Sequence, residues 1–299
     1  MNGSAIAVFG EPSPVSYHTV RVGAVDVFYR EAGPADAPVI LLLHGFPSSS
    51  RMYQALLESE LSTRYRLIAP DYPGFGHSSW PDPRSYAYTF DNLATVMLGF
   101  ADALKLERYT LFMQDYGGPV GFRMAQARPS AVRAMIVQNA VAHDEGLSPL
   151  WAVRRAFWQD RPAHEKELRA NFLSLEATRK RHVGSSPDPS LYNPDLWVDE
   201  HSFLNRPGQG DIQLDLFYDY QSNVKSYPAW QKWLRDNQPP LLVLWGRYDL
   251  SFTVAGAEGY RKDNPRAEIH ILDAGHFASD LQAPAREIIR LTAQFMSRL

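Results

Sequence analysis

The sequence predicts an α/β fold with a mostly parallel central sheet and helices on both of its faces. Short apolar runs alternate with segments of helical apolar spacing, which is typical of such a sheet. The run at residues 39–43 is apolar throughout, as a strand buried on both faces requires. This rhythm stops at about residue 141 and resumes after residue 238, which indicates a helical segment inserted into one α/β unit.

Each strand of the predicted sheet is an apolar run that ends in a turn or leads into a helix. The first two runs are joined around Gly23, which suits a hairpin, and Asp91 places a negative charge in the first turn of a helix. We expect strands at residues 17–22, 25–30, 39–43, 65–69, 109–114, 134–138, 241–245 and 268–272, and helices at 52–61, 90–104, 117–127 and 283–297.

The inserted segment is rich in Trp, Arg and Pro and shows helical patches at 149–158, 163–175 and 211–222. Residues 184–190 have the Gly, Ser and Pro content of a loop, and the basic run at 178–182 is interpreted as a solvated helix face. The sequence therefore predicts a core domain at 1–140 and 239–299 and a helical cap domain at 141–238.

Composition excludes several classes of protein. The net charge of −3 provides no general attraction to nucleic acid or to an anionic membrane. The absence of cysteine excludes disulfides and thiolate sites and fits a cytoplasmic location. Residues 1–14 contain no Lys or Arg and make a poor signal peptide, and no apolar run approaches the length of a membrane-spanning helix.

The turn after the strand at 109–114 carries the most informative residue. The sequence Met-Gln-Asp-Tyr-Gly at 113–117 has the frame of a nucleophile elbow, with Asp115 where a serine usually stands. A serine needs a base before it attacks, whereas a carboxylate is already ionised near neutral pH. Asp115 can therefore displace a leaving group at a saturated carbon and form an alkyl ester, unless it merely caps the following helix.

Three further segments supply partners for Asp115. Asp249 follows the strand at 241–245 and His276 follows the strand at 268–272, which is the order acid then histidine. The sequence His-Gly-Phe-Pro at 44–47 follows an early buried strand. We expect the backbone N–H groups of Phe46 and Tyr116 to form an oxyanion hole.

Five motifs in this order resemble the α/β-hydrolase superfamily over nearly the whole chain. They lie at 44–47, 71–78, 114–118, 245–249 and 275–277. Within the superfamily the chain looks most like the aspartate-nucleophile branch that contains epoxide hydrolases and haloalkane dehalogenases. The resemblance implies that Asp115 attacks carbon and that His276, oriented by Asp249, then activates water to hydrolyse the ester.

The resemblance also implies residues for the leaving group. Epoxide hydrolases protonate the opening oxygen with cap tyrosines, and Tyr220 is expected in this role with Tyr218 as the alternative. Phe157 stands where the family's other cap tyrosine would be. Haloalkane dehalogenases place a Trp directly after the nucleophile, and Tyr116 stands there in this chain.

The sequence therefore predicts a hydrolase that opens an epoxide to a vicinal diol. The alternatives are a haloalkane dehalogenase, an ester or lactone hydrolase, and a ligand-binding relative without turnover. We expect a pocket lined by Phe157, Trp158 and Phe277, with a small apolar molecule and water as partners. No cofactor, metal ion, nucleic acid or membrane is expected.

Overall fold

The computed structural model describes residues 11–299, and within them a single eight-stranded sheet runs in the order β1-β2-β4-β3-β5-β6-β7-β8. The β1–β2 and β2–β4 pairs are antiparallel, and every pair from β4 to β8 is parallel. The expectation of a poor signal peptide rests mainly on residues that lie outside the described part. The strands are Ser16–Val22 (β1), Val25–Ala32 (β2), Val39–Leu43 (β3), Arg66–Pro70 (β4), Tyr109–Gln114 (β5), Val132–Gln138 (β6), Leu241–Gly246 (β7) and Glu268–Leu272 (β8).

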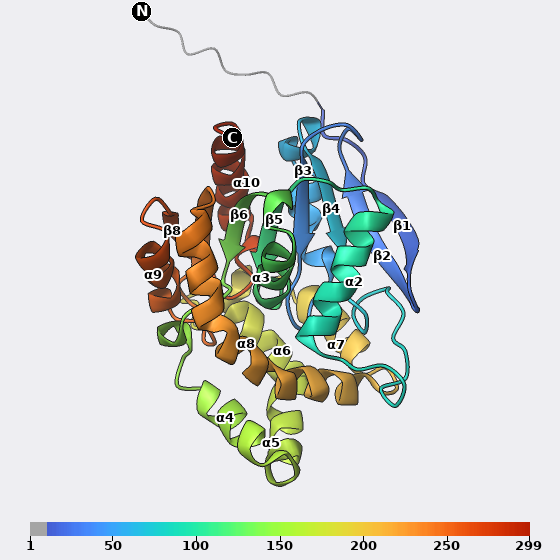
Figure 1. Cartoon of the computed structure of the whole chain (residues 1–299). Helices are drawn as coiled ribbons and strands as arrows, with labels where there is room; N and C mark the ends of the chain where they lie inside the picture. The colour runs from blue at the N-terminus through green and yellow to red at the C-terminus, as the bar shows by residue number, and fades with distance from the viewer. Residues whose placement is uncertain (1–10) are drawn as a thin grey trace, which may run out of the picture.

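Helices cover both faces of this sheet (Figure 1). Successive residues of a strand point to opposite faces, so Leu41 and Leu43 join one apolar cluster while Ile40 and Leu42 join the other. The first cluster includes side chains of α2, α3 and α9, and the second includes side chains of α1 and α10. The predicted fold class is therefore confirmed. These helices are Gln54–Leu57 (α1), Phe90–Ala103 (α2), Gly117–Ala127 (α3), Val254–Asp263 (α9) and Gln282–Met296 (α10).

The chain between β6 and β7 forms the inserted helices, which lie together at one end of the sheet (Figure 1). The division into core and cap domains at 141 and 238 stays a prediction. Of the three expected patches, two match α4 and α5, while the third is the first half of the much longer α8. The inserted helices are Trp151–Gln159 (α4), Arg161–Leu173 (α5), Leu175–Val183 (α6), Asp195–Leu204 (α7) and Gln209–Asn237 (α8).

The interpretation of residues 178–182 as a solvated helix face was right in part. They belong to α6, and Lys180 is exposed, but Thr178 and His182 are fully buried. The His182 ring lies between two carboxylates, with Nδ1 2.6 Å from Asp280 and Nε2 2.7 Å from Glu200. Because α6 buries polar side chains, its buried face has no apolar period in the sequence.

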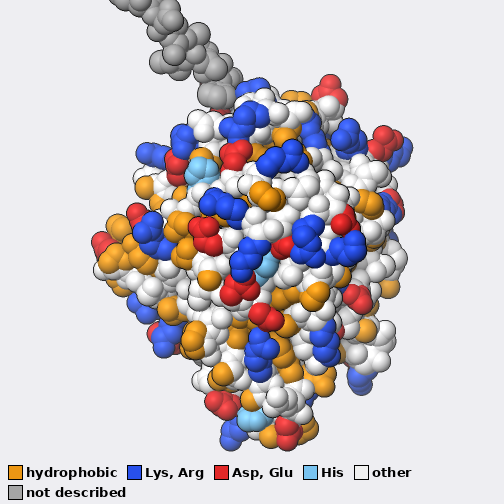
Figure 2. All heavy atoms as spheres, turned by 60° about the vertical axis from the view of Figure 1, so that its left-hand side comes forward, with side chains coloured by type: hydrophobic (Ala, Val, Ile, Leu, Met, Phe, Trp, Pro, Cys, Tyr) orange, Lys and Arg blue, Asp and Glu red, His pale blue; other side chains and the backbone are white. Residues whose placement is uncertain are grey.

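Positive and negative side chains are interspersed over the face shown in Figure 2, as the small net charge suggests. Among residues 11–299, no helix combines the length and the apolar character needed to cross a membrane.

Candidate active site

Asp115 lies in a sharp turn between β5 and α3. Its φ of 48° is in the left-handed region, which non-glycine residues rarely occupy. Two glycines make room for this turn: a Cβ on Gly45 would lie 2.3 Å from the Cβ of Asp115, and a Cβ on Gly117 would lie 2.1 Å from the carbonyl oxygen of Leu43. The turn places the carboxylate at the carboxyl end of β5, where the inserted helices begin to cover the sheet.

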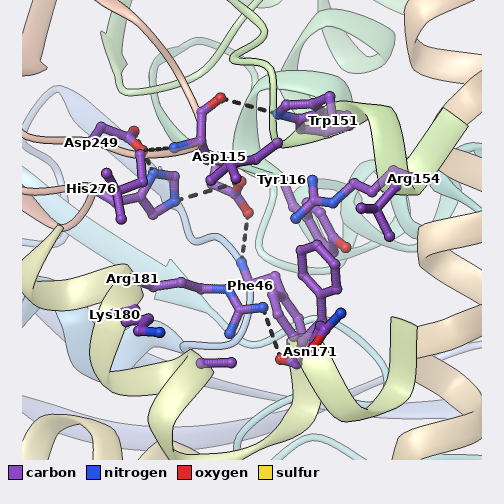
Figure 3. Close-up of a pocket in the computed structure, with 16 residues that line it drawn as sticks. Phe46, Asp115, Tyr116, Trp151, Arg154, Asn171, Lys180, Arg181, Asp249 and His276 are labelled. Atoms are coloured by element: carbon purple, nitrogen blue, oxygen red, sulfur yellow. Dashed lines mark hydrogen bonds and ion pairs between the residues drawn. The ribbon is translucent and has the colours of Figure 1, made fainter. Parts of the chain in front are cut away.

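The two carboxylate oxygens of Asp115 have different surroundings. Oδ1 accepts a hydrogen bond of 2.7 Å from the backbone N–H of Phe46, and the backbone N–H of Tyr116 also bonds the carboxylate. Oδ2 lies 3.6 Å from Nε2 of His276 (Figure 3). One oxygen is therefore held by Phe46, one of the two expected oxyanion donors, and the other lies beside the expected base. Helix α3 has Tyr116 as its N-cap and no side-chain cap, so Asp115 is not there to cap it.

His276 is held by Asp249, as the spacing in the sequence suggests. Its Nδ1 lies 2.7 Å from Oδ2 of Asp249. The other oxygen of Asp249 accepts from the backbone N–H groups of Ser251, at 2.7 Å, and Phe252, at 3.1 Å. The Asn139 amide donates to Oδ2 at 2.9 Å. The acid is thus fixed from four directions, which orients the ring of His276 toward Asp115.

Sequence reasoning missed the role of Asn139. Its side chain joins two neighbouring strand ends. The amide nitrogen donates to Asp249 and to the carbonyl of Gly246, and the amide oxygen accepts from the backbone N–H of Gly246. Its place at the end of β6, directly beside β7, was the available signal.

Burial and neighbouring charges shift the pKa values of Asp115 and His276 in opposite directions. Burial raises the pKa of Asp115, although the positive charge of His276 and the N–H of Phe46 partly offset this effect. Burial alone lowers the pKa of His276, but the carboxylates of Asp249 and Asp115 outweigh it, so that the pKa is raised. The charge on Asp115 thus helps to keep the histidine protonated.

A cavity of about 320 Å³ opens onto Asp115 between the sheet and the inserted helices (Figure 3). This volume is at the small end of the usual range for ligand pockets. Its wall combines catalytic-loop residues with residues of α4, α5 and α6. The lining residues are Phe46, Asp115, Tyr116, Leu150, Trp151, Val153, Arg154, Asn171, Phe172, Ala177, Lys180, Arg181, Asp249, Leu250, Ser251 and His276.

The two expected proton donors lie away from this cavity. Tyr220 is fully buried, with its ring 4.7 Å from that of Trp151 and 5.9 Å from that of Tyr116. Tyr218 is on the surface, with 37% of the residue exposed. Among the sixteen lining residues of the described chain, neither tyrosine occurs. Tyr220 thus packs behind two residues that line the cavity, and its role as a proton donor stays a prediction.

The expected pocket residues Phe157, Trp158 and Phe277 are also not among the lining residues within 11–299. Phe157 packs edge-on against the ring of Tyr218, and the indole N–H of Trp158 donates to the carbonyl of Phe217 at 2.7 Å. Phe277 packs behind His276, with 4.9 Å between the ring centres. The helix spacing of α4 and α6 instead turns Trp151, Arg154 and Arg181 inward, which the sequence alone did not reveal.

The chain belongs to the α/β-hydrolase fold family, whose profile matches residues 38–283. It is 42% identical to a Saccharomyces cerevisiae protein named as an uncharacterized hydrolase, over 93% of this chain and 97% of that protein. A haloalkane dehalogenase from Mycobacterium marinum is 36% identical over 42% of this chain and 44% of its own length. Epoxide hydrolase 2 from Caenorhabditis elegans is 28% identical over 84% of this chain and 72% of its own length.

Proposed function

We propose that the protein hydrolyses a bond between a saturated carbon and a leaving group through a covalent ester on Asp115. The observation that carries this proposal is the unequal placement of the two carboxylate oxygens. Oδ1 is already held by the N–H group of Phe46, and Oδ2 lies 3.6 Å from Nε2 of His276. This is the arrangement that an ester carbonyl and its alkyl-bearing oxygen would need.

In the first step Oδ2 of Asp115 attacks the substrate carbon. A carbon–oxygen bond forms, and the bond to the leaving group breaks with its electron pair going to that group. The carboxylate needs no base for this step, because it is ionised above its own pKa. Oδ1 becomes the carbonyl oxygen of the ester and keeps its hydrogen bond from the N–H group of Phe46.

In the second step water attacks Cγ of Asp115 while Nε2 of His276 takes its proton. The negative charge develops on Oδ1, where the N–H groups of Phe46 and Tyr116 receive it. The intermediate then releases the alcohol with Oδ2 and a proton from His276, and the water oxygen stays on Asp115. Asp249 continues to raise the pKa of His276, but the neutral ester removes the further contribution of Asp115, which makes the histidine easier to deprotonate and so to use as a base.

A halide is the leaving group that this cavity supports best. A halide departs as an anion and needs no proton, so its departure does not depend on a cap tyrosine. An epoxide requires a proton donor, and neither Tyr220 nor Tyr218 is among the cavity residues of the described chain. The partial match to a haloalkane dehalogenase also supports a halide over an epoxide oxygen as the leaving group.

Epoxide opening is the second candidate because of Tyr116. This residue lines the cavity, and its buried hydroxyl has no hydrogen-bond partner within residues 11–299. Burial raises the pKa of Tyr116 well above its ordinary value, so the hydroxyl keeps its proton at neutral pH. The more distant match to an epoxide hydrolase is in agreement.

Trapping the ester tests this function. In His276→Gln the first step is retained and the second loses its base, so an adduct is expected to accumulate on the peptide that carries Asp115. Haloalkanes and epoxides, each offered with and without a carboxylate, are compared by mass spectrometry, and Asp115→Asn is the matched control. The absence of an adduct from every compound, with esterase activity in the unaltered protein, would contradict the proposal.

A further inference from the structure

Two of the inserted helices each direct an arginine into the cavity: Arg154 from α4 and Arg181 from α6 (Figure 3). Arg154 is only 7% exposed. Within residues 11–299 its guanidinium makes no hydrogen bond and no ion pair with a carboxylate; ring faces surround it instead. Its central carbon lies 4.0 Å from the ring centre of Trp151 and 4.7 Å from that of Phe172.

Arg181 is held on one side only. Its Nη2 donates to the backbone carbonyl of Phe172 at 2.8 Å, and its guanidinium carbon lies 4.6 Å from the ring centre of Phe46. Its Nη1 is buried and has no partner in the described chain. Both guanidinium groups pack on the ring of Phe172, so the two positive charges are neighbours at one wall of the cavity.

The charge of Asp115 acts on both arginines, but within residues 11–299 neither Asp115 nor Asp249 makes a hydrogen bond or an ion pair with them. Asp115 is bonded to Phe46 and faces His276, and Asp249 is bonded to His276 and its own loop. Burial, together with the charge of Arg154, lowers the pKa of Arg181 to about 9. A buried charge without a partner is costly, so a pair of them in an otherwise well-paired protein indicates a place for an anion.

We propose that a carboxylate of the substrate binds between Arg154 and Arg181, and hence that the substrate is a small organic acid. The planar guanidinium groups offer paired N–H donors that match the two oxygens of a carboxylate. They line the wall formed by the inserted helices, while Asp115 lies on the wall formed by the sheet. The acid group would therefore face the inserted helices while the reacting carbon faces Oδ2 of Asp115.

This assignment rests on the proposed function for the identity of the reacting carbon, but the anion site can be measured without any reaction. The exposed Lys180 lies at the rim of the same cavity and adds positive charge to the approach of an acid. Long-range attraction of this kind weakens as salt screens it. We therefore propose a substrate with an apolar part and one acidic group, where the sequence led us to expect an apolar molecule.

Equilibrium binding of butyrate and of the isosteric, neutral butyramide tests the site. Calorimetry is expected to show saturable butyrate binding to the unaltered protein and binding of butyramide at least about tenfold weaker. Arg154→Gln and Arg181→Gln are each expected to weaken butyrate binding by about tenfold or more. The matched controls are Arg155→Gln and Arg179→Gln, which remove partly exposed arginines next to them in sequence and are expected to bind as the unaltered protein does.

The Tm of each variant is measured with and without butyrate, which shows both that the variant is folded and whether it binds. Butyrate is expected to raise the Tm of the unaltered protein and of both controls but not that of Arg154→Gln or Arg181→Gln. Equal binding of butyrate and butyramide, no saturable butyrate binding, or full binding by Arg154→Gln would overturn the inference. Bromide binding in place of butyrate would also overturn it and would assign the arginines to the leaving group.

The two proposals fail in different ways. Butyrate binding that depends on both arginines, with no adduct in His276→Gln, would retain the acid site and remove the covalent mechanism. Adducts from neutral substrates, with no butyrate binding, would retain the mechanism and remove the acid site.

Discussion

At the scale of single residues, the proposed chemistry depends on the carboxylate of Asp115 and on its electrostatic interaction with His276. Each group shifts the pKa of the other: the histidine offsets part of the increase that burial causes in the pKa of Asp115, and the carboxylate of Asp115 contributes to the raised pKa of the histidine. Ester formation removes this coupling. The two steps of the proposed reaction therefore depend on different protonation states.

This coupling predicts two separate pH dependences. Ester formation requires ionised Asp115, so its rate in His276→Gln should fall only as the pH drops through the raised pKa of Asp115. Hydrolysis requires neutral His276, so turnover by the unaltered protein should decline at a higher pH than ester formation does. Single-turnover rates at a series of pH values measure both. Profiles that fall together at one pH would show that a single group controls both steps.

Asn139 provides a second prediction at this scale. It acts on the reaction through Asp249, because its amide donates to the carboxylate that holds His276. Asn139→Ala is expected to slow ester hydrolysis by about tenfold, from the loss of a hydrogen bond to a charged group worth about 1.5–3 kcal/mol. Ester formation should change much less, because His276 is not its base. Equal losses in both steps would indicate a general structural defect instead.

At the scale of elements, the strands could be predicted well and the inserted helices only in part. The run at 39–43 is continuous and apolar because β3 is buried on both faces, and such a run has few other interpretations. Helix α6 buries His182, whose partners Glu200 and Asp280 lie far away in the sequence. No apolar period marks a buried face of this kind, so the sequence indicated a helix at 178–182 but neither its buried face nor the place of Arg181 at the cavity.

The His182 cluster joins α6 and α7 to the loop that follows His276. His182→Gln would leave the carboxylates of Glu200 and Asp280 buried without a cation, and we expect the free energy of unfolding to fall by about 3–5 kcal/mol. Urea unfolding at neutral pH measures this loss. His201→Gln, which removes a histidine on the surface of α7, is the control and should change little.

The same cluster predicts a loss of stability in alkali. The two carboxylates raise the folded-state pKa of His182 to about 10, above the ordinary value of 6.5, even though burial opposes them. A raised histidine pKa contributes stability that is fully present below the unfolded pKa and is lost as pH rises through the folded one. Unfolding free energies should therefore fall toward pH 10 in the unaltered protein and show a smaller fall in His182→Gln. A fall of equal size in both proteins would contradict this assignment.

At the scale of the whole molecule, the catalytic group could be predicted because each of its members follows a strand. Asp115, Asp249 and His276 lie after β5, β7 and β8, and the parallel sheet brings these strand ends to one edge. The cavity could not be predicted in the same way. Its other wall depends on how α4, α5 and α6 pack over that edge, and no local pattern states which of their side chains turn inward.

The central claim is that the carboxylate of Asp115 forms an ester with a saturated carbon of a small organic acid, whose own carboxylate stays free. The most direct measurement is the mass of the Asp115 peptide after His276→Gln is incubated with 2-bromobutyrate or with 2-bromobutyramide. The account predicts that Asp115 displaces bromide from 2-bromobutyrate, so that the peptide gains the mass of the remaining carboxyalkyl group. The amide should react far more slowly. The double variant Asp115→Asn, His276→Gln should give no adduct on this peptide. An unmodified Asp115 peptide after incubation with the acid would contradict the account.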